Sequence, residues 1–278
     1  MWQDVKERSK QYNKTITNVI IGDSRSKAGL VPNLMGEDWY NYSVGGGTPI
    51  EGYYTLKRII ESGNELDNLI LSYGPFHLTK EDTYWHRTNK FHFLSPLDYI
   101  EISNVADELD DPILGDDRSW YDYWVKPGSY FGDIKKSIFR LQINSNNNKK
   151  VSETINKSKG QYFFGRKESS SGMNQETHIK VGFKPSPLLD HYLKKAIKLA
   201  HENKIDIFWV TLPHNESSFS VIDSNFNNGF DYYIRNLSNI TPLTLSHSLP
   251  DSCFGDPSHL FNCSNTFTES IYMKIKKD

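Results

Sequence analysis

Short apolar runs alternate with helix-like stretches along this 278-residue chain, and that alternation limits the folds open to it. The runs have the length of buried β-strands, and the stretches between them repeat apolar residues at spacings of three and four, which is typical of amphipathic helices. We predict strands over residues 18–22, 39–44, 68–73, 206–212 and 240–245, and helices over 48–62, 186–203 and 260–277. Strands separated by helices indicate an α/β fold with a doubly wound, mostly parallel, flavodoxin-like sheet of about five strands.

The alternation stops between residues 76 and 184. This stretch contains the aromatic segment 120–124 and several runs rich in Asn and Ser. A structureless loop of that length is implausible inside a compact domain. We therefore expect a single domain over 1–278 with an insertion or cap over 76–184 that forms some helices of its own. The aromatic segment either stacks against sugar rings or packs inside the cap.

Two short motifs at opposite ends of the chain contain residue types that act in catalysis. Gly22-Asp23-Ser24 follows the first predicted strand, and Asp256-Pro-Ser-His259 precedes the last predicted helix. A serine becomes a nucleophile when a histidine takes its proton, and a carboxylate orients that histidine. Ser24 is therefore the candidate nucleophile, His259 the base and Asp256 the orienting acid. Gly-Asp-Ser also occurs as a simple strand-ending turn or helix N-cap.

The run Gly45-Gly46-Gly47 follows the second predicted strand. Glycine lets the backbone approach a substrate closely, so the amide of Gly46 could join that of Ser24 in stabilising an oxyanion, with Gly45 lining the substrate. A tight turn explains the triplet equally well. It is not a phosphate loop of the Walker kind, because no Gly-Lys-Ser or Gly-Lys-Thr follows.

Arg25, His77 and His214 each follow a predicted strand end. All three could line a substrate pocket, Arg25 by pairing with a substrate carboxylate. The simpler interpretations are a surface ion pair for Arg25 and satisfied surface histidines for the other two.

Together these motifs resemble those of the SGNH (GDSL-type) hydrolases. The insert and the block Asn41-Tyr-Ser-Val-Gly-Gly46 look most similar to the bacterial cell-surface polysaccharide O-acetyltransferases and esterases, the alginate-acetylation and DltD-like branch. The resemblance covers roughly residues 15–75 and 186–278. It implies Ser24, His259 and Asp256 as the catalytic residues and the amides of Ser24 and Gly46 as oxyanion donors. The third block departs from the family's Gly-x-Asn-Asp, since 72–77 holds no asparagine.

The resemblance implies a serine esterase or O-acyltransferase that needs no cofactor or metal. Its substrate would be a carbohydrate or polysaccharide, and a membrane-bound acyl-donor protein is a further candidate partner. Hydrolysis and transfer share every step up to the acceptor, so both stay open. The alternative is a non-catalytic carbohydrate-binding or assembly module that retains the fold. The absent asparagine favours the module, whereas the retained Ser24, Asp256 and His259 favour the enzyme.

Composition excludes other classes. The formal charge is −2 without a basic stripe, so nucleic acid is not an expected partner. The histidines have no metal-ligand spacing. No apolar stretch reaches the length of a membrane span, although an anchor or export signal could precede the given chain.

The chain's two cysteines, Cys253 and Cys263, bracket Asp256 and His259. A disulfide between them would staple this loop and imply an extracytoplasmic setting, whereas two reduced thiols would suit the cytoplasm. Localisation therefore stays open between an extracytoplasmic or membrane-associated protein and a cytoplasmic one.

Overall fold

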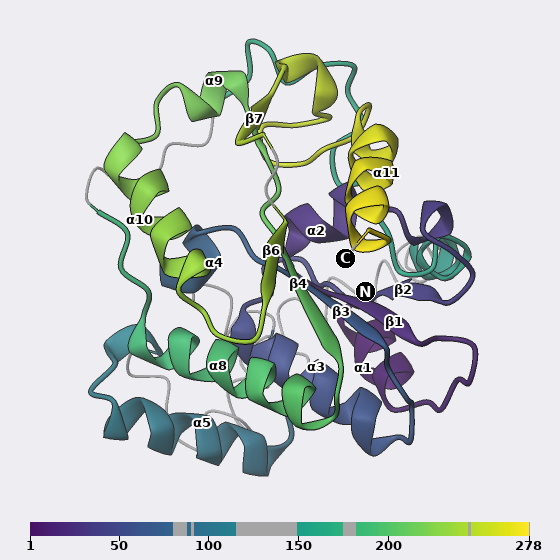
Figure 1. Ribbon diagram of the computed structural model, residues 1–278, viewed down its shortest axis with the longest axis vertical. Coiled ribbons are helices and arrows are strands. Elements are labelled where there is room, and N and C mark those ends of the chain that lie inside the picture. Colours follow the sequence, from purple (N-terminus) through teal and green to yellow (C-terminus); the bar gives the residue numbers. More distant parts are fainter. Residues whose placement is uncertain (80–87, 90–91, 115–148, 175–181, 244–245, 278) are drawn as a thin grey trace, which may run out of the picture.

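A five-stranded parallel sheet crosses the molecule, with helices on both of its faces (Figure 1). The computed structural model describes residues 1–79, 88–89, 92–114, 149–174, 182–243 and 246–277. The strands lie in the order β2-β1-β3-β4-β6, which is flavodoxin-like, and every neighbouring pair is parallel. They are β1 (Asn18–Gly22), β2 (Trp39–Asn41), β3 (Asn68–Ser72), β4 (Asp206–Val210) and β6 (Thr241–Leu243). The predicted fold class is confirmed.

Alternate residues of each strand enter different cores, as expected for a sheet covered on both faces. On one face α1 (Trp2–Ser9), α3 (Pro49–Glu61), α8 (Pro187–Glu202) and α10 (Ser224–Arg235) pack against Val19, Ile21, Leu69 and Leu71. On the other face α11 (Ser264–Ile275), together with the residues that follow α2 (Ser24–Gly29), packs against Ile20, Ile70 and Phe208. The carboxyl ends of all five strands consequently meet at one edge of the sheet.

Helix starts follow the sequence signals closely. Thr48 and Glu51 form a capping box at the start of α3, and the Ser186 side chain caps α8, each with proline at the first helical position. The last helix begins at Ser264, later than the predicted 260, because Leu260 instead bridges to Phe254. The sequence pattern did not predict α10, whose buried Phe226, Phe230 and Ile234 are spaced four apart within an Asn-rich segment.

The strand β1 has its predicted bounds, whereas β2, β3 and β4 end earlier than predicted. The second strand stops at Asn41, although the chain continues along β1 through hydrogen bonds from Tyr42 N to Ile20 O and from Val44 N to Gly22 O. The edge strand β6 contains Pro242, which has no backbone N–H to donate, on a strand that has a neighbour on one side only.

Shorter elements complete the fold: η1 (Pro32–Leu34), α4 (Phe76–Thr79), η3 (Pro112–Leu114), β5 (His214–Asn215), α9 (Glu216–Phe219), β7 (Ser248–Leu249) and η5 (Asp251–Cys253).

Part of the stretch between β3 and α8 belongs to the main core. The helix α5 (Pro96–Glu108) lies beside α8 in Figure 1 and buries Tyr99, Ile102 and Ala106 in the core that α3 and α8 share. Residues 149–157 are also helical. The aromatic segment 120–124 lies outside the described residues.

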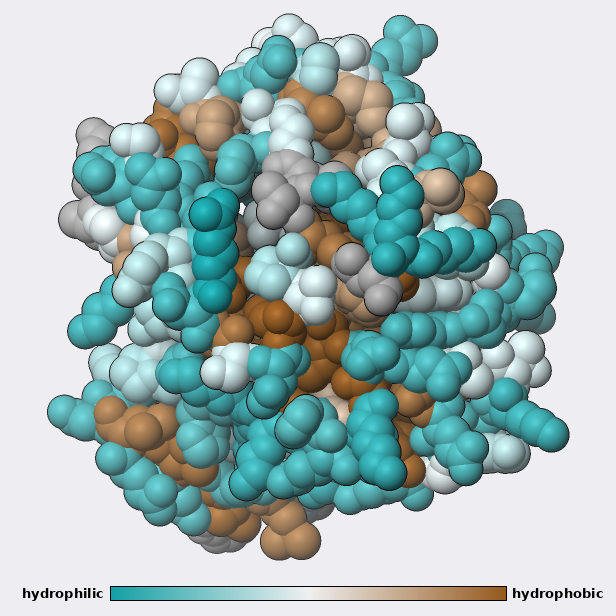
Figure 2. Space-filling model, in the orientation of Figure 1, coloured by the Kyte–Doolittle hydropathy of each residue, from teal (hydrophilic) through white to brown (hydrophobic). Residues whose placement is uncertain are grey.

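Apolar side chains are visible in the middle of the face in Figure 2, in the area of β4 and β6, and polar ones surround them. A smaller apolar area lies over α5, where Leu97 and Ile100 are exposed. Within the part of the chain that the structure describes, no helix combines the length and apolarity that crossing a bilayer requires.

Candidate active site

Ser24 is the first residue of α2 and follows β1 almost directly. Asp23 is the N-cap: its Oδ1 accepts hydrogen bonds from Arg25 N at 2.8 Å and Ser26 N at 3.3 Å. The Asp23 side chain is completely buried, whereas Ser24 is partly exposed. The cap thus fixes the backbone around Ser24 and presents this residue at the carboxyl edge of the sheet.

The second carboxylate oxygen of Asp23 reaches the neighbouring strand. Asp23 Oδ2 accepts a hydrogen bond from Gly74 N at 2.7 Å, just beyond the end of β3, and lies 3.7 Å from His77 Nε2. One buried carboxylate therefore ties together the ends of β1 and β3, next to Ser24.

Arg25 and His214 connect the end of β1 to the segment after β4. Both are almost fully buried, and Arg25 Nη1 lies 3.1 Å from His214 Nδ1. Their interpretation as surface residues is wrong, because the two side chains face each other inside the protein. His77 is partly buried beside Asp23.

The glycine loop lies against the same edge. Val44 N donates to Gly22 O at 3.0 Å, and a Cβ at Gly47 would lie only 3.1 Å from that carbonyl oxygen. Gly46 has a φ of +73°, a conformation that other residues rarely adopt. The loop therefore brings Gly45 and Gly46 to the strand end that carries Ser24.

Lys27, one turn after Ser24, is completely buried. Its Nζ donates hydrogen bonds to Ser43 O at 2.8 Å and to Gly160 O at 2.7 Å. Burial lowers the pKa of Lys27 to about 7, an effect that the more distant charge of Asp4 only partly offsets. This lysine joins α2 to the start of the glycine loop and to the segment at residue 160.

Asp256 and His259 form a pair within one turn of chain. His259 Nδ1 lies 2.9 Å from both carboxylate oxygens of Asp256, and Asp256 Oδ1 also accepts from Ser258 N and His259 N, each at 2.9 Å. Burial alone would raise the pKa of Asp256. The hydrogen bond and charge of His259 and the two backbone donors outweigh burial, so this pKa lies below its ordinary value.

The pairing assigns roles to the two ring nitrogens of His259. With Nδ1–H directed at the carboxylate, Nε2 is the nitrogen that can accept a proton. Nε2 is buried and has no hydrogen-bond partner among the residues that the structure describes. In particular, it makes no hydrogen bond to Ser24.

A disulfide closes the loop that holds this pair. Cys253 and Cys263 are bonded, with an S–S distance of 1.99 Å, which decides between the two cysteine alternatives. Inside the loop, Gly255 N donates to His259 O at 3.1 Å. The loop is thus held both covalently and by its own backbone.

Two contacts bring this loop to α2. Leu260 packs at the far end of the helix, where a Cβ at Gly29 would lie 3.2 Å from Leu260 Cδ1. Residues 160–170, which we call the bridging segment, connect the two parts: Tyr162 N donates to Lys27 O at 3.1 Å, and Lys167 N donates to Gly255 O at 3.2 Å.

Sequence reasoning missed Lys27 and the bridging segment. A lysine on a short polar helix carries no signal of burial, because its partners are carbonyls from other parts of the chain. The aromatic run at 162–164 was visible, but its place beside His259 depends on the tertiary fold.

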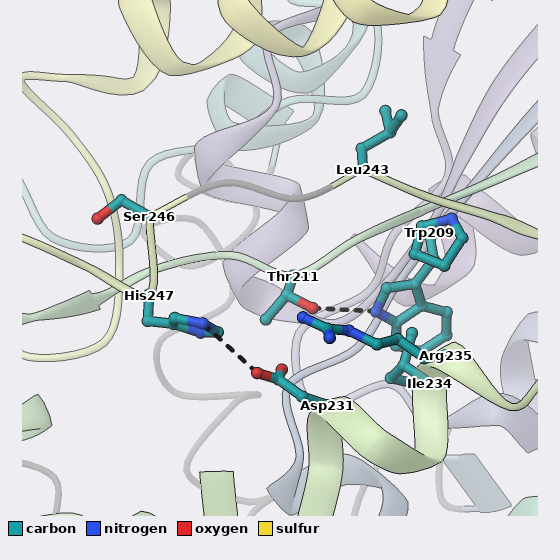
Figure 3. Close-up of a pocket in the computed structure, with 9 residues that line it drawn as sticks. Trp209, Thr211, Asp231, Ile234, Arg235, Leu243, Ser246 and His247 are labelled. Atoms are coloured by element: carbon teal, nitrogen blue, oxygen red, sulfur yellow. Dashed lines mark hydrogen bonds and ion pairs between the residues drawn. The ribbon is translucent and has the colours of Figure 1, made fainter. Parts of the chain in front are cut away.

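A second acid–histidine pair lines a small cavity of about 40 Å³ between α10 and the ends of β4 and β6 (Figure 3). His247 Nε2 lies 3.4 Å from Asp231 Oδ2, and Trp209 Nε1 donates to Thr211 Oγ1 at 3.1 Å. Ser246, on the same wall, points away from His247 in the figure and donates to Ser248 O. Across the described ranges, no group of three or more His, Cys, Asp or Glu side chains is arranged to hold a metal ion.

No protein-family model matches the sequence, and no curated protein matches it either. Among solved structures, the chain is similar to an acetyl xylan esterase from the rumen bacterium Butyrivibrio proteoclasticus, with 10% sequence identity and a TM-score of 0.36. The similarity covers 96% of this chain and 64% of that one. The resemblance is weak and concerns the fold alone.

Proposed function

We propose that this protein is a serine-dependent acyltransfer enzyme of the SGNH type, an O-acetyl esterase or O-acetyltransferase acting on carbohydrate. The observation that carries the proposal is the Asp256–His259 pair. Its carboxylate holds Nδ1 and leaves Nε2 as the basic nitrogen, on a loop packed against the helix that begins at Ser24.

In the proposed reaction, Ser24 Oγ attacks the ester carbonyl and His259 Nε2 takes the hydroxyl proton. The amides of Ser24 and Gly46 stabilise the oxyanion of the tetrahedral intermediate. The intermediate collapses to acetyl-Ser24, and Nε2 gives its proton to the departing alcohol. Water or a carbohydrate hydroxyl then attacks the acetyl group, with Nε2 again as base; the bond between the acetyl group and Ser24 Oγ breaks, and Nε2 returns the proton to Oγ. Asp256 holds the imidazolium that forms in each half of the reaction.

The absent Ser24–His259 hydrogen bond is compatible with this mechanism. Catalytic hydrogen bonds are often long or unformed without substrate and tighten when it binds. We assign Arg25 and His214, which pair with each other, to holding the strand ends. His77 and Gly45 are the residues proposed to line the substrate.

The branch, domain division and compartment belong to the same proposal. The insert and the glycine block support the cell-surface polysaccharide acetylation branch, and we treat 1–278 as one domain with an insertion over 76–184. Disulfides persist in oxidising compartments, so Cys253–Cys263 supports an extracytoplasmic setting.

Labelling with a fluorophosphonate, followed by peptide mass mapping, tests the nucleophile and its base together. We expect label on Ser24 in the wild type, none on Ser24→Ala, and a labelling rate lower by roughly 10³-fold or more in His259→Ala. Ser246→Ala, beside the second acid–histidine pair, is the matched control and should label like wild type. A folded protein that takes no label on any serine would contradict the proposal and favour the non-catalytic carbohydrate-binding module.

A further inference from the structure

Two aromatic side chains of the bridging segment pack on the loop of Asp256 and His259. The ring of Phe163, which is partly buried, meets that of Phe261 edge-on at 5.0 Å. Phe164 lies over His259, with ring centroids 4.8 Å apart and planes at 34°. An aromatic residue from outside the two motifs therefore covers the ring of the proposed base.

Glycines set the close approach of this segment. A Cβ at Gly165 would clash with Asp256 Oδ2 and with the backbone of Gly255, and a Cβ at Gly255 would clash with Gly165 O. Only two residues without side chains allow the backbones to pass at this distance. Phe164 is thereby held firmly beside the loop that carries Asp256 and His259.

The outward side of the segment combines aromatic rings with a cation. Phe164 is 37% exposed, and Tyr162, which is partly exposed, meets it edge-on at 5.4 Å. The exposed Arg166 places its guanidinium carbon 5.8 Å from the Tyr162 ring. An open aromatic face flanked by hydrogen-bond donors suits a ligand with one apolar face and a polar rim.

We propose that Phe164, Tyr162 and Arg166 form a platform that binds a sugar ring of the substrate. A pyranose matches this surface, because its C–H face can lie on Phe164 while its hydroxyls accept hydrogen bonds from Arg166. A sugar seated there is separated from the His259 ring by the Phe164 ring, so the platform would hold a sugar next to the candidate site. This inference rests on the proposed function, in which the substrate is a carbohydrate. It adds the residues that select that carbohydrate.

Kinetics with two esters of the same acyl group separate this role from catalysis. For an acetylated oligosaccharide, Phe164→Ala should raise KM at least about tenfold. Whatever the change for p-nitrophenyl acetate, which has no sugar, kcat/KM for the oligosaccharide should fall at least about tenfold further. Phe164→Trp restores an aromatic face and should recover the oligosaccharide KM. Tyr12→Ala removes an exposed aromatic side chain elsewhere and is the matched control.

A binding measurement makes the outcome independent of catalysis. Ser24→Ala and Ser24→Ala/Phe164→Ala are applied to immobilised neutral and acidic oligosaccharides. Binding by the first variant and its loss in the second support the platform, even if no ester is turned over and the proposed function fails. An active enzyme whose oligosaccharide KM and binding are indifferent to Phe164, or a Ser24→Ala protein that binds no oligosaccharide, overturns the platform and leaves the acyl-enzyme proposal standing.

Discussion

The start of α2 and the Asp256–His259 loop, the two halves of the candidate site, are held in place by different means. Around Ser24, buried polar groups bind to distant parts of the chain: Asp23 to Gly74, Arg25 to His214, and Lys27 to two carbonyls. The loop, by contrast, is closed by a disulfide and by hydrogen bonds that Asp256 makes within its own turn.

The stability of each half of the site therefore depends on a different kind of interaction. A buried polar group stabilises only while every partner is present, because an unpaired buried donor or acceptor costs about 1–3 kcal/mol. A disulfide acts mainly by restricting the unfolded chain, so it does not depend on such matched partners. The half with the nucleophile should therefore be sensitive to single substitutions. The half with the base should be sensitive to reduction of the disulfide.

Asp256→Asn should give the largest effect, a fall in kcat of about 10⁴-fold with the fold intact, as when the acid of a Ser–His–Asp triad becomes an amide. The amide no longer holds Nδ1–H or balances the imidazolium. Steady-state kinetics measures the fall in kcat, and circular dichroism checks that the fold is intact. Asp231→Asn, in the second acid–histidine pair, is the control and should keep full activity; equal losses in both variants would contradict the assignment.

Asp23→Ala should lower the free energy of unfolding by about 3 kcal/mol. The substitution removes an N-cap, worth about 1 kcal/mol, and leaves the Gly74 amide without its acceptor. Urea denaturation measures the loss. Asp223 caps α10 through a single hydrogen bond to Asn225 N, so Asp223→Ala should lose only the cap. Similar losses in the two variants would show that the contact with Gly74 contributes nothing.

Removing the disulfide should cost slightly less, about 2.5 kcal/mol for a closed loop of this length. The variant Cys253→Ser/Cys263→Ser tests this by urea denaturation, alongside wild type with and without reductant. We also expect activity to fall, since the Asp256–His259 loop loses its brace. Equal free energies of unfolding for the oxidised and the reduced wild type would show that the disulfide does not contribute to stability.

The smallest effect concerns pH. Because the pKa of Lys27 is about 7 in the folded protein and roughly 10.5 in the unfolded chain, the unfolded state binds more protons between these values. Stability should therefore rise with pH above 7, by roughly 1 kcal/mol between pH 7 and 8 from this group. Below about pH 6 both states are protonated and Lys27 adds no slope.

Unfolding free energies of wild type and Lys27→Met at these two pH values isolate that slope. The variant should lose the rise and also be less stable, since two carbonyls lose their donor. Lys198→Met, on the exposed side of α8, should keep the wild-type slope. A slope that survives in Lys27→Met would place the titrating group elsewhere.

Much of the fold could be predicted because its signals are local. The strands at 18–22, 68–72 and 206–210 are apolar runs, and Thr48 and Ser186 cap helices through residues two or three positions away. The helix α10 was missed because asparagines and a glycine obscured its apolar spacing. The burial of Arg25 and His214 was misjudged because each is polar in sequence and finds its partner in the other.

The sequence by itself determined the strand–helix alternation, the N-cap at Asp23 and the Asp256–His259 turn, since each depends on residues a few positions apart. Only the tertiary structure decided that Asp23 meets Gly74, that Lys27 is buried between Ser43 and Gly160, and that Phe164 covers His259. Such contacts join segments far apart in the chain. They form only after the sheet has brought its strand ends to one edge, and no local periodicity encodes them.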